Sequence, residues 1–471
     1  MRASSIAVAV AATLLTGCTV GPNYKRPQVA APPNFRAPEP LPEPQAGSLA
    51  DLKWFEVFRD EQLQNLIRTA LVQNYDLRDA VTRVEEARAN LGITRSNQFP
   101  QVGASGDLEI TRLSRNGSFE LPAALVPNQN RNWGQAGLNL LSFELDLWGR
   151  LRRATEAARA NLLNADWNRK TVISTVVSQV ATNYFQLLEL DSELQISQST
   201  LETRRASLEL TEDRERGGVA TLLDLRQAEE LVDTAAESIP QFQQQIEQTE
   251  DQISLLLGKN PQGIPRGHGL LEQHLPPDVP AGLPSSLLER RPDIRAAEQA
   301  LIAANANIGV AKAAYFPQIT LSGFIGGQSA QLTSLFSGPS SAWTFVPQIT
   351  QPIFTAGRIK SNVHLTEAQR QEAQVAYEES IRTAFKEVSD ALIAHQRTRE
   401  SRIVQERLVI TLQDRKRLAY ARYQGGVDTQ LNALDADRDL LSAELTLAQI
   451  RYAELVTVVQ LYKALGGGWQ A

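Results

Sequence analysis

Few side chains in this chain of 471 residues are of the kinds that perform catalysis or hold metal ions. The histidines are His268, His274, His364 and His395, and their spacing fits no metal-binding motif. The sequence contains no HExxH segment, no phosphate-binding loop and only one cysteine, Cys18. We interpret the histidines as solvated or helix-capping residues. The sequence therefore predicts that the protein is not an enzyme and has no metal site or cofactor.

Cys18 follows a segment that is typical of an export signal. Arg2 precedes an apolar run at residues 6–15, and the small residues Thr16 and Gly17 separate this run from the cysteine. The run is too short to cross a bilayer as a helix, but it matches the apolar part of a secretory signal peptide. A lone cysteine cannot form a disulfide within the chain, and a catalytic thiol would need a base nearby. The LLTGC sequence instead resembles a bacterial lipobox, in which the cysteine is acylated and becomes the new N-terminus.

This interpretation predicts a lipoprotein signal peptide at residues 1–17 and a covalent lipid on Cys18. Position 19 is Thr rather than Asp, which in such lipoproteins favours sorting to the outer membrane. Each buried methylene contributes about 0.8 kcal/mol, so several acyl chains on one residue would anchor the protein stably in outer-membrane lipids. An ordinary signal peptide with an incidental cysteine is the alternative.

Charge and composition argue against a nucleic-acid partner and predict a tether. The chain has 47 Lys and Arg against 53 Asp and Glu, a net charge of −6, and no basic stripe. Residues 22–44 contain eight prolines, and this composition favours an extended polyproline II conformation over a packed element. We interpret residues 18–50 as the acylated cysteine and a proline-rich tether.

The rest of the chain is a repeat. The segment NLGITRSNQFP (90–100) aligns with NIGVAKAAYFP (307–317), and RGGVATLLDLRQAE (216–229) aligns with QGGVDTQLNALDAD (424–437). The two copies of the second motif are separated by fewer residues than the two copies of the first. The second repeat is therefore shorter between its two motifs, and we place the missing residues in the non-helical stretch after the FP dipeptide. Fixed elements with a variable loop between them indicate a duplicated architecture. We assign the first repeat to residues 51–261, a linker to 262–284 and the second repeat to 285–471.

Each repeat contains a long stretch without proline, at residues 149–216 and 357–424. An uninterrupted helix of this length would extend about 100 Å, at about 1.5 Å per residue. Apolar residues at every seventh position of the first stretch indicate coiled-coil packing; they are Ile173, Val180, Leu187, Leu194, Leu201 and Leu208. The second stretch has a fainter pattern, because His395 and Arg402 occupy places where the heptad would have apolar residues.

A Gly-Gly-Val turn and a return helix follow each long stretch. The return helices also keep a period of seven, although Pro240 is expected to kink the first of them. Each repeat is therefore predicted to form an antiparallel helical hairpin. The tips are Gly217, Gly218 and Val219 in the first repeat and Gly425, Gly426 and Val427 in the second. Shorter helices near 60–98 and 285–315 are expected to stack end to end with the return helices.

Between the FP dipeptides and the long helices the apolar period changes to two. The alternating residues are Val102, Ala104, Gly106, Leu108 and Ile110 in the first repeat and Ile319, Leu321 and Gly323 in the second. Each span has about the length of a membrane strand, and Trp133 and Trp343 open the returning strands, where interfacial aromatic residues occur. The apolar face changes phase near Leu140-Leu141, which suggests a β-bulge. Alternation also fits a soluble sheet, but a helix about 100 Å long does not fit inside a soluble domain.

Two hairpins supply four strands, and four strands cannot close a barrel. Open sheet edges are not stable in a membrane, so several copies of the chain must share one barrel. Two copies would supply eight strands and three would supply twelve, and only the larger barrel leaves an open lumen. The predicted fold is mainly α-helical with a membrane β-barrel portion.

Longer segments resemble one known family. PAGLPSSLLERRPDIRAAEQALIAANANIGVAKAAYFPQITLSG (280–323), GCTVGPNYKRP (17–27) and WFEVFRDEQLQNLI (54–67) are similar to the TolC-like outer-membrane factors. The resemblance is to the OprM/NodT-like lipoprotein branch, which serves resistance-nodulation-division efflux pumps, and it covers nearly the whole mature chain. It implies a homotrimer with a twelve-stranded barrel that continues into an α-helical barrel across the periplasm. It also implies a periplasmic membrane-fusion adaptor at the hairpin tips, an inner-membrane pump and a passive exit duct.

The family's gate residues carry over in part. The resemblance places an aspartate ring at Asp435, an apolar ring at Leu431 one helical turn earlier, and a tyrosine before the tip at Tyr423. Asp224 in the first repeat matches an aspartate of the facing helix. The family's locking arginine aligns with Asp428 and a second gate aspartate aligns with Asn432, so the locking network of the family is not reproduced here.

Other functions fit the same architecture. It could export a polypeptide or metal cations with a different inner-membrane partner. The single methionine of the chain is Met1, and this disfavours a copper path lined by methionines. A lipid-anchored coiled-coil spacer without a pore would keep the heptads but would have no use for strands with one polar and one apolar face.

Overall fold

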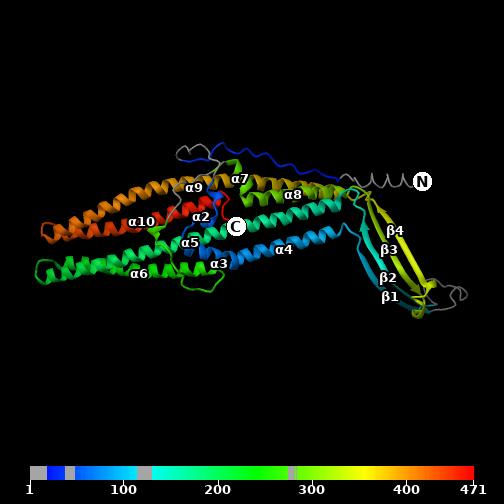
Figure 1. The fold of residues 1–471 in the computed structure, drawn as a ribbon, viewed down its shortest axis with the longest axis horizontal. Coiled ribbons are helices and arrows are strands. Elements are labelled where there is room, and N and C mark those ends of the chain that lie inside the picture. Colours follow the sequence, from blue (N-terminus) through cyan, green and yellow to red (C-terminus); the bar gives the residue numbers. More distant parts are fainter. Residues whose placement is uncertain are drawn as a thin grey trace. The chain divides into compact units, whose positions relative to one another are not determined.

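The computed structural model describes residues 19–37, 48–112, 114, 130–273, 282 and 284–470 (Figure 1). The chain forms two compact units. The first consists of Met1–Pro27, Val84–Asn164 and Ala297–Ala376, and the second of Gln28–Arg83, Ala165–Ala296 and Tyr377–Ala471. The signal peptide, Cys18, His274 and parts of the predicted tether and linker lie outside the described residues.

Helices account for most of the described chain. They are α2 (Trp54–Val57), α3 (Glu61–Gln73), α4 (Tyr75–Ser96), α5 (Arg150–Arg216), α6 (Leu222–Leu256), α7 (Pro284–Arg290), α8 (Pro292–Ala313), α9 (Arg358–Gln424) and α10 (Gln430–Ala464). Short 3-10 turns are η1 (Leu49–Asp51), η2 (Leu270–Glu272), η3 (Leu332–Ser334) and η4 (Gly338–Ser340). In the part of the chain that is described, no helix is both long enough and apolar enough to traverse a bilayer.

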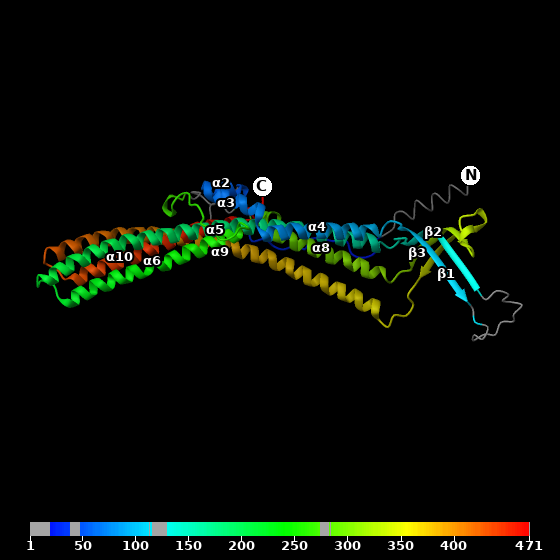
Figure 2. The same ribbon diagram turned by 90° about the horizontal axis from the view of Figure 1, so that it is seen from below.

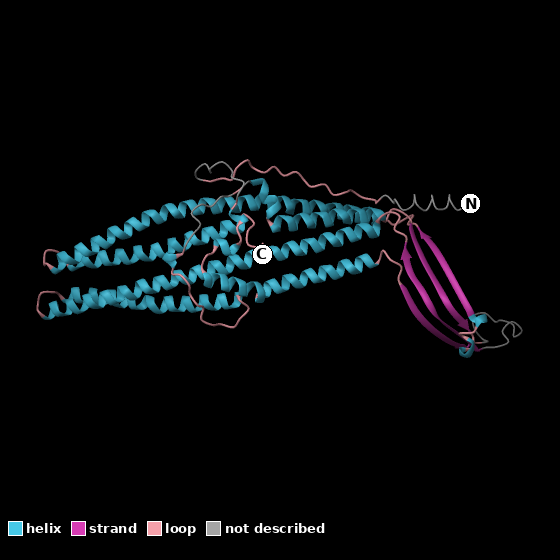
Figure 3. Ribbon diagram, in the orientation of Figure 1, coloured by secondary structure: helices cyan, strands magenta, loops and turns pink. Residues whose placement is uncertain are grey.

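The first unit contains an antiparallel sheet with the strand order β1-β2-β3-β4 (Figure 3). The strands are β1 (Val102–Arg112), β2 (Asn130–Glu144), β3 (Gln318–Ser329) and β4 (Ser341–Thr350). Pairing of β2 with β3 joins the two repeats, and its register shifts between Leu140 and Phe143. This shift confirms the bulge expected near Leu140-Leu141, because an irregularity there turns the following side chains to the opposite face.

The chain forms two helical hairpins, α5 with α6 and α9 with α10 (Figure 2), and most of their residues belong to the second unit. The long helices α5 and α9 each have 67 residues, as the proline-free stretches predicted. In α5 the heptad residues Val180 and Leu187 have no solvent-exposed surface. In the second hairpin Val409 of α9 packs with Leu440 and Ala443 of α10. The second hairpin is thus held together by apolar contacts between its own helices, and the heptad face of α5 is buried.

The polar residues in the heptad of α9 have partners on α10. His395 Nδ1 lies 3.1 Å from Thr457 Oγ1, and Arg402 Nε lies 2.7 Å from Glu454 Oε2. Burial lowers the pKa of His395, which favours the neutral imidazole in this hydrogen bond. The heptad pattern of α9 is faint in the sequence because polar contacts with α10 replace apolar ones at His395 and Arg402.

The two shorter helices are divided, which the sequence interpretation did not predict. α3 and α4 meet at buried Asn74, whose Oδ1 accepts a hydrogen bond from Leu77 N at 3.0 Å and so caps α4. α7 and α8 meet at Arg291, because the following Pro292 lacks an amide hydrogen and disfavours a helical conformation in the preceding residue. The expected stacking on the return helices is present, since Asn74 Nδ2 donates to Leu256 O at the end of α6 at 2.9 Å.

Asp60 fastens the segment after α6 to the start of α3. Its carboxylate caps α3 and accepts hydrogen bonds from the Tyr184 hydroxyl at 3.1 Å, from His268 N at 3.0 Å and from Gln273 Nε2 at 2.9 Å. Burial alone would raise the pKa of Asp60, but the hydrogen bonds from Gln273, the backbone and Tyr184 outweigh it and lower the pKa. At pH values above the ordinary pKa of an aspartate, the charged Asp60 carboxylate stabilises the folded state. This stabilisation is lost as the pH falls through the lowered pKa of Asp60.

We expect Asp60→Asn to lower the free energy of unfolding by about 2 kcal/mol near neutral pH, because buried donors lose a charged acceptor. The difference from the parent should shrink at acidic pH, where the parent carboxylate is protonated. Thermal unfolding in detergent at several pH values would measure it. Exposed Glu61→Gln is the control. A difference between Asp60→Asn and the parent that does not change with pH would contradict the assigned role.

Candidate functional site

The sheet of the first unit has one polar and one apolar face. Gln135 Nε2 donates to Asp107 Oδ2 at 2.8 Å, and Gln328 Nε2 donates to Gln135 Oε1 at 3.1 Å, so that polar side chains link three strands. Apolar Leu108 and Ile110 of β1 are 61% and 75% exposed. An exposed apolar face is unusual for a soluble sheet and normal for a sheet that faces lipid.

Within one chain, the described sheet has two edge strands that are each paired on one side only. β1 and β4 each have one neighbouring strand in the described sheet, so each has a free edge of backbone donors and acceptors. Trp343 lies near the start of β4 and is 74% exposed. Such edges must be paired before the sheet can lie in lipid.

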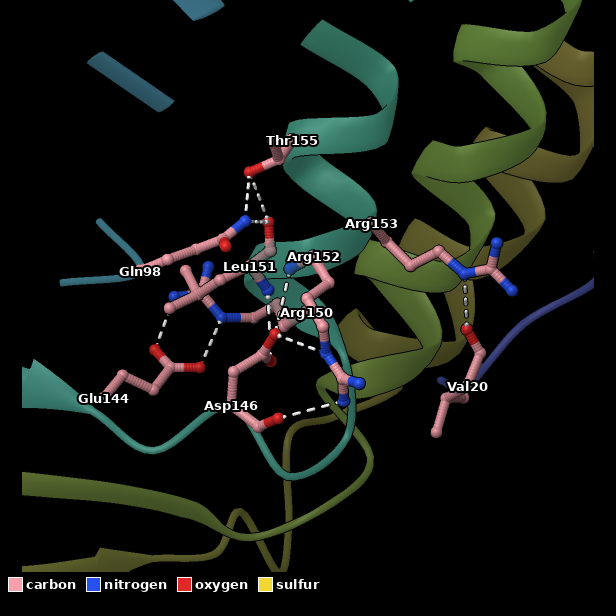
Figure 4. A network of polar contacts seen from close by, with 9 residues as sticks. All are labelled: Val20, Gln98, Glu144, Asp146, Arg150, Leu151, Arg152, Arg153 and Thr155. Atoms are coloured by element: carbon pink, nitrogen blue, oxygen red, sulfur yellow. Dashed lines mark hydrogen bonds and ion pairs between the residues drawn. The ribbon is translucent and has the colours of Figure 1, made fainter. Parts of the chain in front are cut away.

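A polar network joins the sheet to the start of α5 (Figure 4). Arg150 Nε donates to Glu144 Oε1 at the end of β2 at 2.8 Å, and Asp146 Oδ2 accepts from Arg152 N at 2.9 Å. Gln98 Nε2, just beyond α4, donates to Thr155 Oγ1 at 2.5 Å. Asp146 supplies negative charge where the first amide groups of α5 lack helical partners. The strand therefore passes into the long helix through a junction held by charge-assisted hydrogen bonds.

The second FP dipeptide lies at this junction as well. Trp148 stacks on Phe316 with ring centroids 4.7 Å apart, and its Nε1 donates to Pro317 O at 2.8 Å. The two FP dipeptides thus mark the places where a helix is followed by a strand.

The N-terminal arm, residues 19–27, packs against α5 and α8 within the first unit, which the tether interpretation did not foresee. Arg153 of α5 donates to Val20 O at 3.3 Å and to Asn23 Oδ1 at 2.7 Å. Gly21 has a φ of 97°, and a Cβ atom at this position would lie 2.5 Å from the Cα of Gly309 in α8. The arm has no regular secondary structure, as its composition predicted, but it follows a defined path that two glycines permit.

Both predicted tips are tight turns between helices. Gly218 and Gly426 each have a φ of 72°, a left-handed conformation that glycine adopts at little energetic cost. The next residues, Val219 and Val427, are 71% and 67% exposed. The two tips thus present the same apolar side chain to the surroundings from the same turn.

Leu431 and Asp435 lie one turn apart at the start of α10. Leu431 is 53% exposed, and the Asp435 carboxylate is partly exposed and pairs with Arg438 at 3.1 Å. Residues at this spacing share one face of a helix. Sequence reasoning missed Arg438, although a basic residue three positions after an acidic one on a helix is a recognisable pairing signal.

Tyr423 and Asp224 have local roles that the resemblance did not indicate. Tyr423 is buried at the end of α9, with the Arg214 guanidinium of α5 4.6 Å from its ring centroid. Asp224 caps α6, because its carboxylate accepts hydrogen bonds from both the amide and the hydroxyl of Thr221 at 2.8 Å. No local pattern in the sequence could have paired Arg214 with Tyr423, since they lie in different repeats.

Asp428 is engaged within the second hairpin. Arg422 Nε lies 3.0 Å from its Oδ2, and Asn432 Nδ2 donates to its Oδ1 at 2.7 Å. The hydrogen bonds from Arg422 and then from Asn432 lower the pKa of Asp428. The position aligned with the family's locking arginine therefore carries a carboxylate that is paired with a neighbour on α9.

A family model described as outer membrane efflux protein matches residues 66–259 and 283–467. The probable efflux pump outer membrane protein TtgC of Pseudomonas putida is 38% identical over 474 residues, which cover 100% of this chain and 96% of that protein. The cation efflux system protein CusC of Escherichia coli K12 is 37% identical over 460 residues, which cover 97% of this chain and 98% of that protein.

A solved structure of an outer membrane channel is also similar to this chain. The MtrE outer membrane channel of Neisseria gonorrhoeae, in its open state, superposes with a TM-score of 0.86 at 33% identity, covering 96% of this chain and 99% of that chain. The chain belongs to the outer membrane efflux protein family. Its fold is that of the TolC-like channels, as the sequence predicted, and it is an outer-membrane efflux channel.

Proposed function

We propose that three copies of this chain form the exit duct of a tripartite efflux pump. The observation that carries the proposal is the open-edged sheet with an exposed apolar face, joined through the network of Figure 4 to a helix of 67 residues. Twelve strands from three copies would close a barrel around an open lumen, whereas eight would fill it with side chains. The helices would continue the duct through the periplasm, and energy would enter at the inner-membrane pump.

The proposed partners follow the family. A periplasmic membrane-fusion adaptor would contact the tips at Val219 and Val427, and a resistance-nodulation-division pump would lie below it. Leu431 and Asp435 would form rings at the periplasmic constriction, with Tyr423 and Asp224 beside them. The exposure of Leu431 and of both tip valines in the single chain supports these assignments.

Drugs or other small organic molecules are the substrates we favour. One relative is named for an efflux pump and another for cation efflux, so cations are the second candidate. Deletion of the gene followed by growth on organic drugs and on metal salts separates the two. Sensitivity to metal salts alone would favour the cation alternative.

Recording from purified trimers in planar bilayers tests the channel itself. We expect discrete current steps, because a twelve-stranded barrel leaves an aqueous lumen. Folded trimers that give no steps would favour the alternative of a lipid-anchored spacer without a pore.

We also propose that Cys18 carries the lipid anchor in the outer membrane. The bound arm supports this, because it would hold the acylated residue next to the strand-to-helix junction. We expect Cys18→Ser to lose all incorporation of labelled palmitate while trimers still form, since strands hold the barrel in the membrane. Thr19→Ser, which keeps the thiol, is the control. Label retained in Cys18→Ser would place the lipid elsewhere, and a parent without label would show that there is none.

A further inference from the structure

Buried polar side chains join the two hairpins between α5 and α10. Thr211 and Arg204 lie one heptad apart on α5, and Gln430 and Asp437 lie one heptad apart on α10. Gln430 Nε2 donates to Thr211 Oγ1 at 3.0 Å, and Arg204 Nε donates to Asp437 Oδ2 at 2.7 Å. All four side chains are buried. We call these two contacts the polar seam.

The ion pair of the polar seam is well enclosed. The Arg204 and Asp437 side chains are 3% and 1% exposed. Each also has a second partner: Lys416 Nζ of α9 lies 2.5 Å from Asp437 Oδ1, and Arg204 Nη1 donates to Leu231 O of α6 at 2.9 Å. One carboxylate and one guanidinium thus connect all four helices.

Because of these second partners, the two hairpins can move apart at the polar seam without leaving either charged group unpartnered. Lys416 belongs to the same hairpin as Asp437, and Leu231 belongs to the same hairpin as Arg204. If the hairpins move apart, neither charge is left without a partner. A buried ion pair that loses one member is strongly destabilised, and this arrangement avoids that outcome.

Inside the second hairpin, apolar contacts accompany the polar ones. Val409, Leu440 and Ala443 form an apolar cluster between α9 and α10, and parting them would expose apolar surface to water. Parting the polar seam exposes groups that water solvates well. The second hairpin is therefore built to move as one piece against α5.

The polar seam lies close to the proposed gate along the same helix. Asp437 follows Asp435 by two residues on α10 and Leu431 by less than two turns. A shift of α10 at Asp437 must therefore shift Leu431 and Asp435.

We propose that Arg204 is a positioning residue of the gate. By holding Asp437 it keeps α10 in the resting position, and release of this pair, with Lys416 retaining the carboxylate, lets the second hairpin move and widen the constriction. The proposal rests on the proposed gate at Leu431 and Asp435, and it adds the residues that hold that gate closed.

Arg204→Met is the principal test, because methionine keeps much of the apolar stem and Asp437 keeps Lys416. We expect single-channel open probability in planar bilayers to rise at least about tenfold, which corresponds to about 1.4 kcal/mol. Arg415→Met is the matched control. Its ion pair with Asp439 also involves α10 but lies within the second hairpin, with both side chains exposed, so open probability should not change.

A reversible cross-link tests the movement itself. Thr211→Cys and Gln430→Cys together replace the hydrogen-bonded pair of the polar seam. In the Arg204→Met background, oxidation should return open probability to the parent value and reduction should raise it again. A raised open probability that oxidation does not reverse would overturn the proposal, because the hairpins would then not be parting at the polar seam.

A second comparison separates the failure of this inference from the failure of the gate. Arg204→Met trimers with parental open probability would overturn the role of Arg204 if Leu431→Ser with Asp435→Ala conducts more than the parent. If that gate variant also behaves like the parent, the gate assignment itself is wrong, and the inference fails with it.

Discussion

The double variant Leu431→Ser with Asp435→Ala is expected to conduct more current than the parent channel and to admit large antibiotics such as vancomycin. In a trimer, three Leu431 side chains, each 53% exposed in the single chain, would meet at the axis and narrow the aperture. Three Asp435 carboxylates would form a ring one turn away. At separations near 7 Å each pair would repel by about 0.6 kcal/mol in water, and by more where water is excluded. Such a ring attracts cations and disfavours anions.

Single-channel recordings with salt gradients, together with drug susceptibility of cells, would measure both effects. Asp435→Asn alone should mainly lower cation selectivity, because it removes the charge of the ring but keeps Leu431. Asp439→Asn is the control, since this carboxylate lies one turn further along α10 and pairs with Arg415. A double variant with intact trimers, unchanged conductance and unchanged selectivity would show that the constriction lies elsewhere.

Replacing Gly426 with valine is expected to abolish efflux while trimers still reach the membrane. Gly426 has a φ of 72°, and a β-branched residue in this conformation is strongly disfavoured. A Cβ atom there would meet no atom within 4 Å, so valine would not disturb the packing of the helices. The loss would come from a distorted turn and from a side chain in the space where the adaptor is proposed to dock. Gly218→Val in the first tip should act in the same way.

Two further variants isolate the cause. Gly92→Val adds the same side chain inside α4, where a Cβ atom also meets nothing within 4 Å, and it should leave efflux unchanged. Gly426→Ala should have a smaller effect than Gly426→Val. Minimum inhibitory concentrations and cross-linking to the adaptor provide the measurements. Normal resistance and normal cross-linking in Gly426→Val would exclude this tip, together with neighbouring Gly425, as the docking site.

The architecture of each repeat could be predicted from the sequence because it depends on local patterns. Proline-free stretches determined the extent of α5 and α9, and the Gly-Gly-Val motifs marked both hairpin tips. The change of apolar period from seven to two located the strands, and the loss of phase near Leu140 located the bulge. In each case the physical cause, a backbone restriction or a repeating face, acts within a few residues.

Site residues were predictable only as far as the family resemblance extends. It predicts a gate at Leu431 and Asp435, but it does not indicate that Tyr423 lies beside Arg214 or that Asp224 caps its own helix. The break at Asn74 depends on the end of α6, which supplies the carbonyl group that Asn74 binds. Contacts of this kind require the relative register of two helices, and periodicity does not specify it.

By itself, the sequence determined the long helices and their lengths, the positions of the strands, where the hairpins turn and which family the chain resembles. The tertiary structure alone decided how the arm binds and how the hairpins meet. Arg153 reaches Val20, and Arg204 reaches Asp437, across more than a hundred residues of chain. An arginine on a helix surface has the same local sequence pattern whether it faces water or a buried carboxylate. Only the packing of distant helices at a particular register removes the water and brings the two charges together.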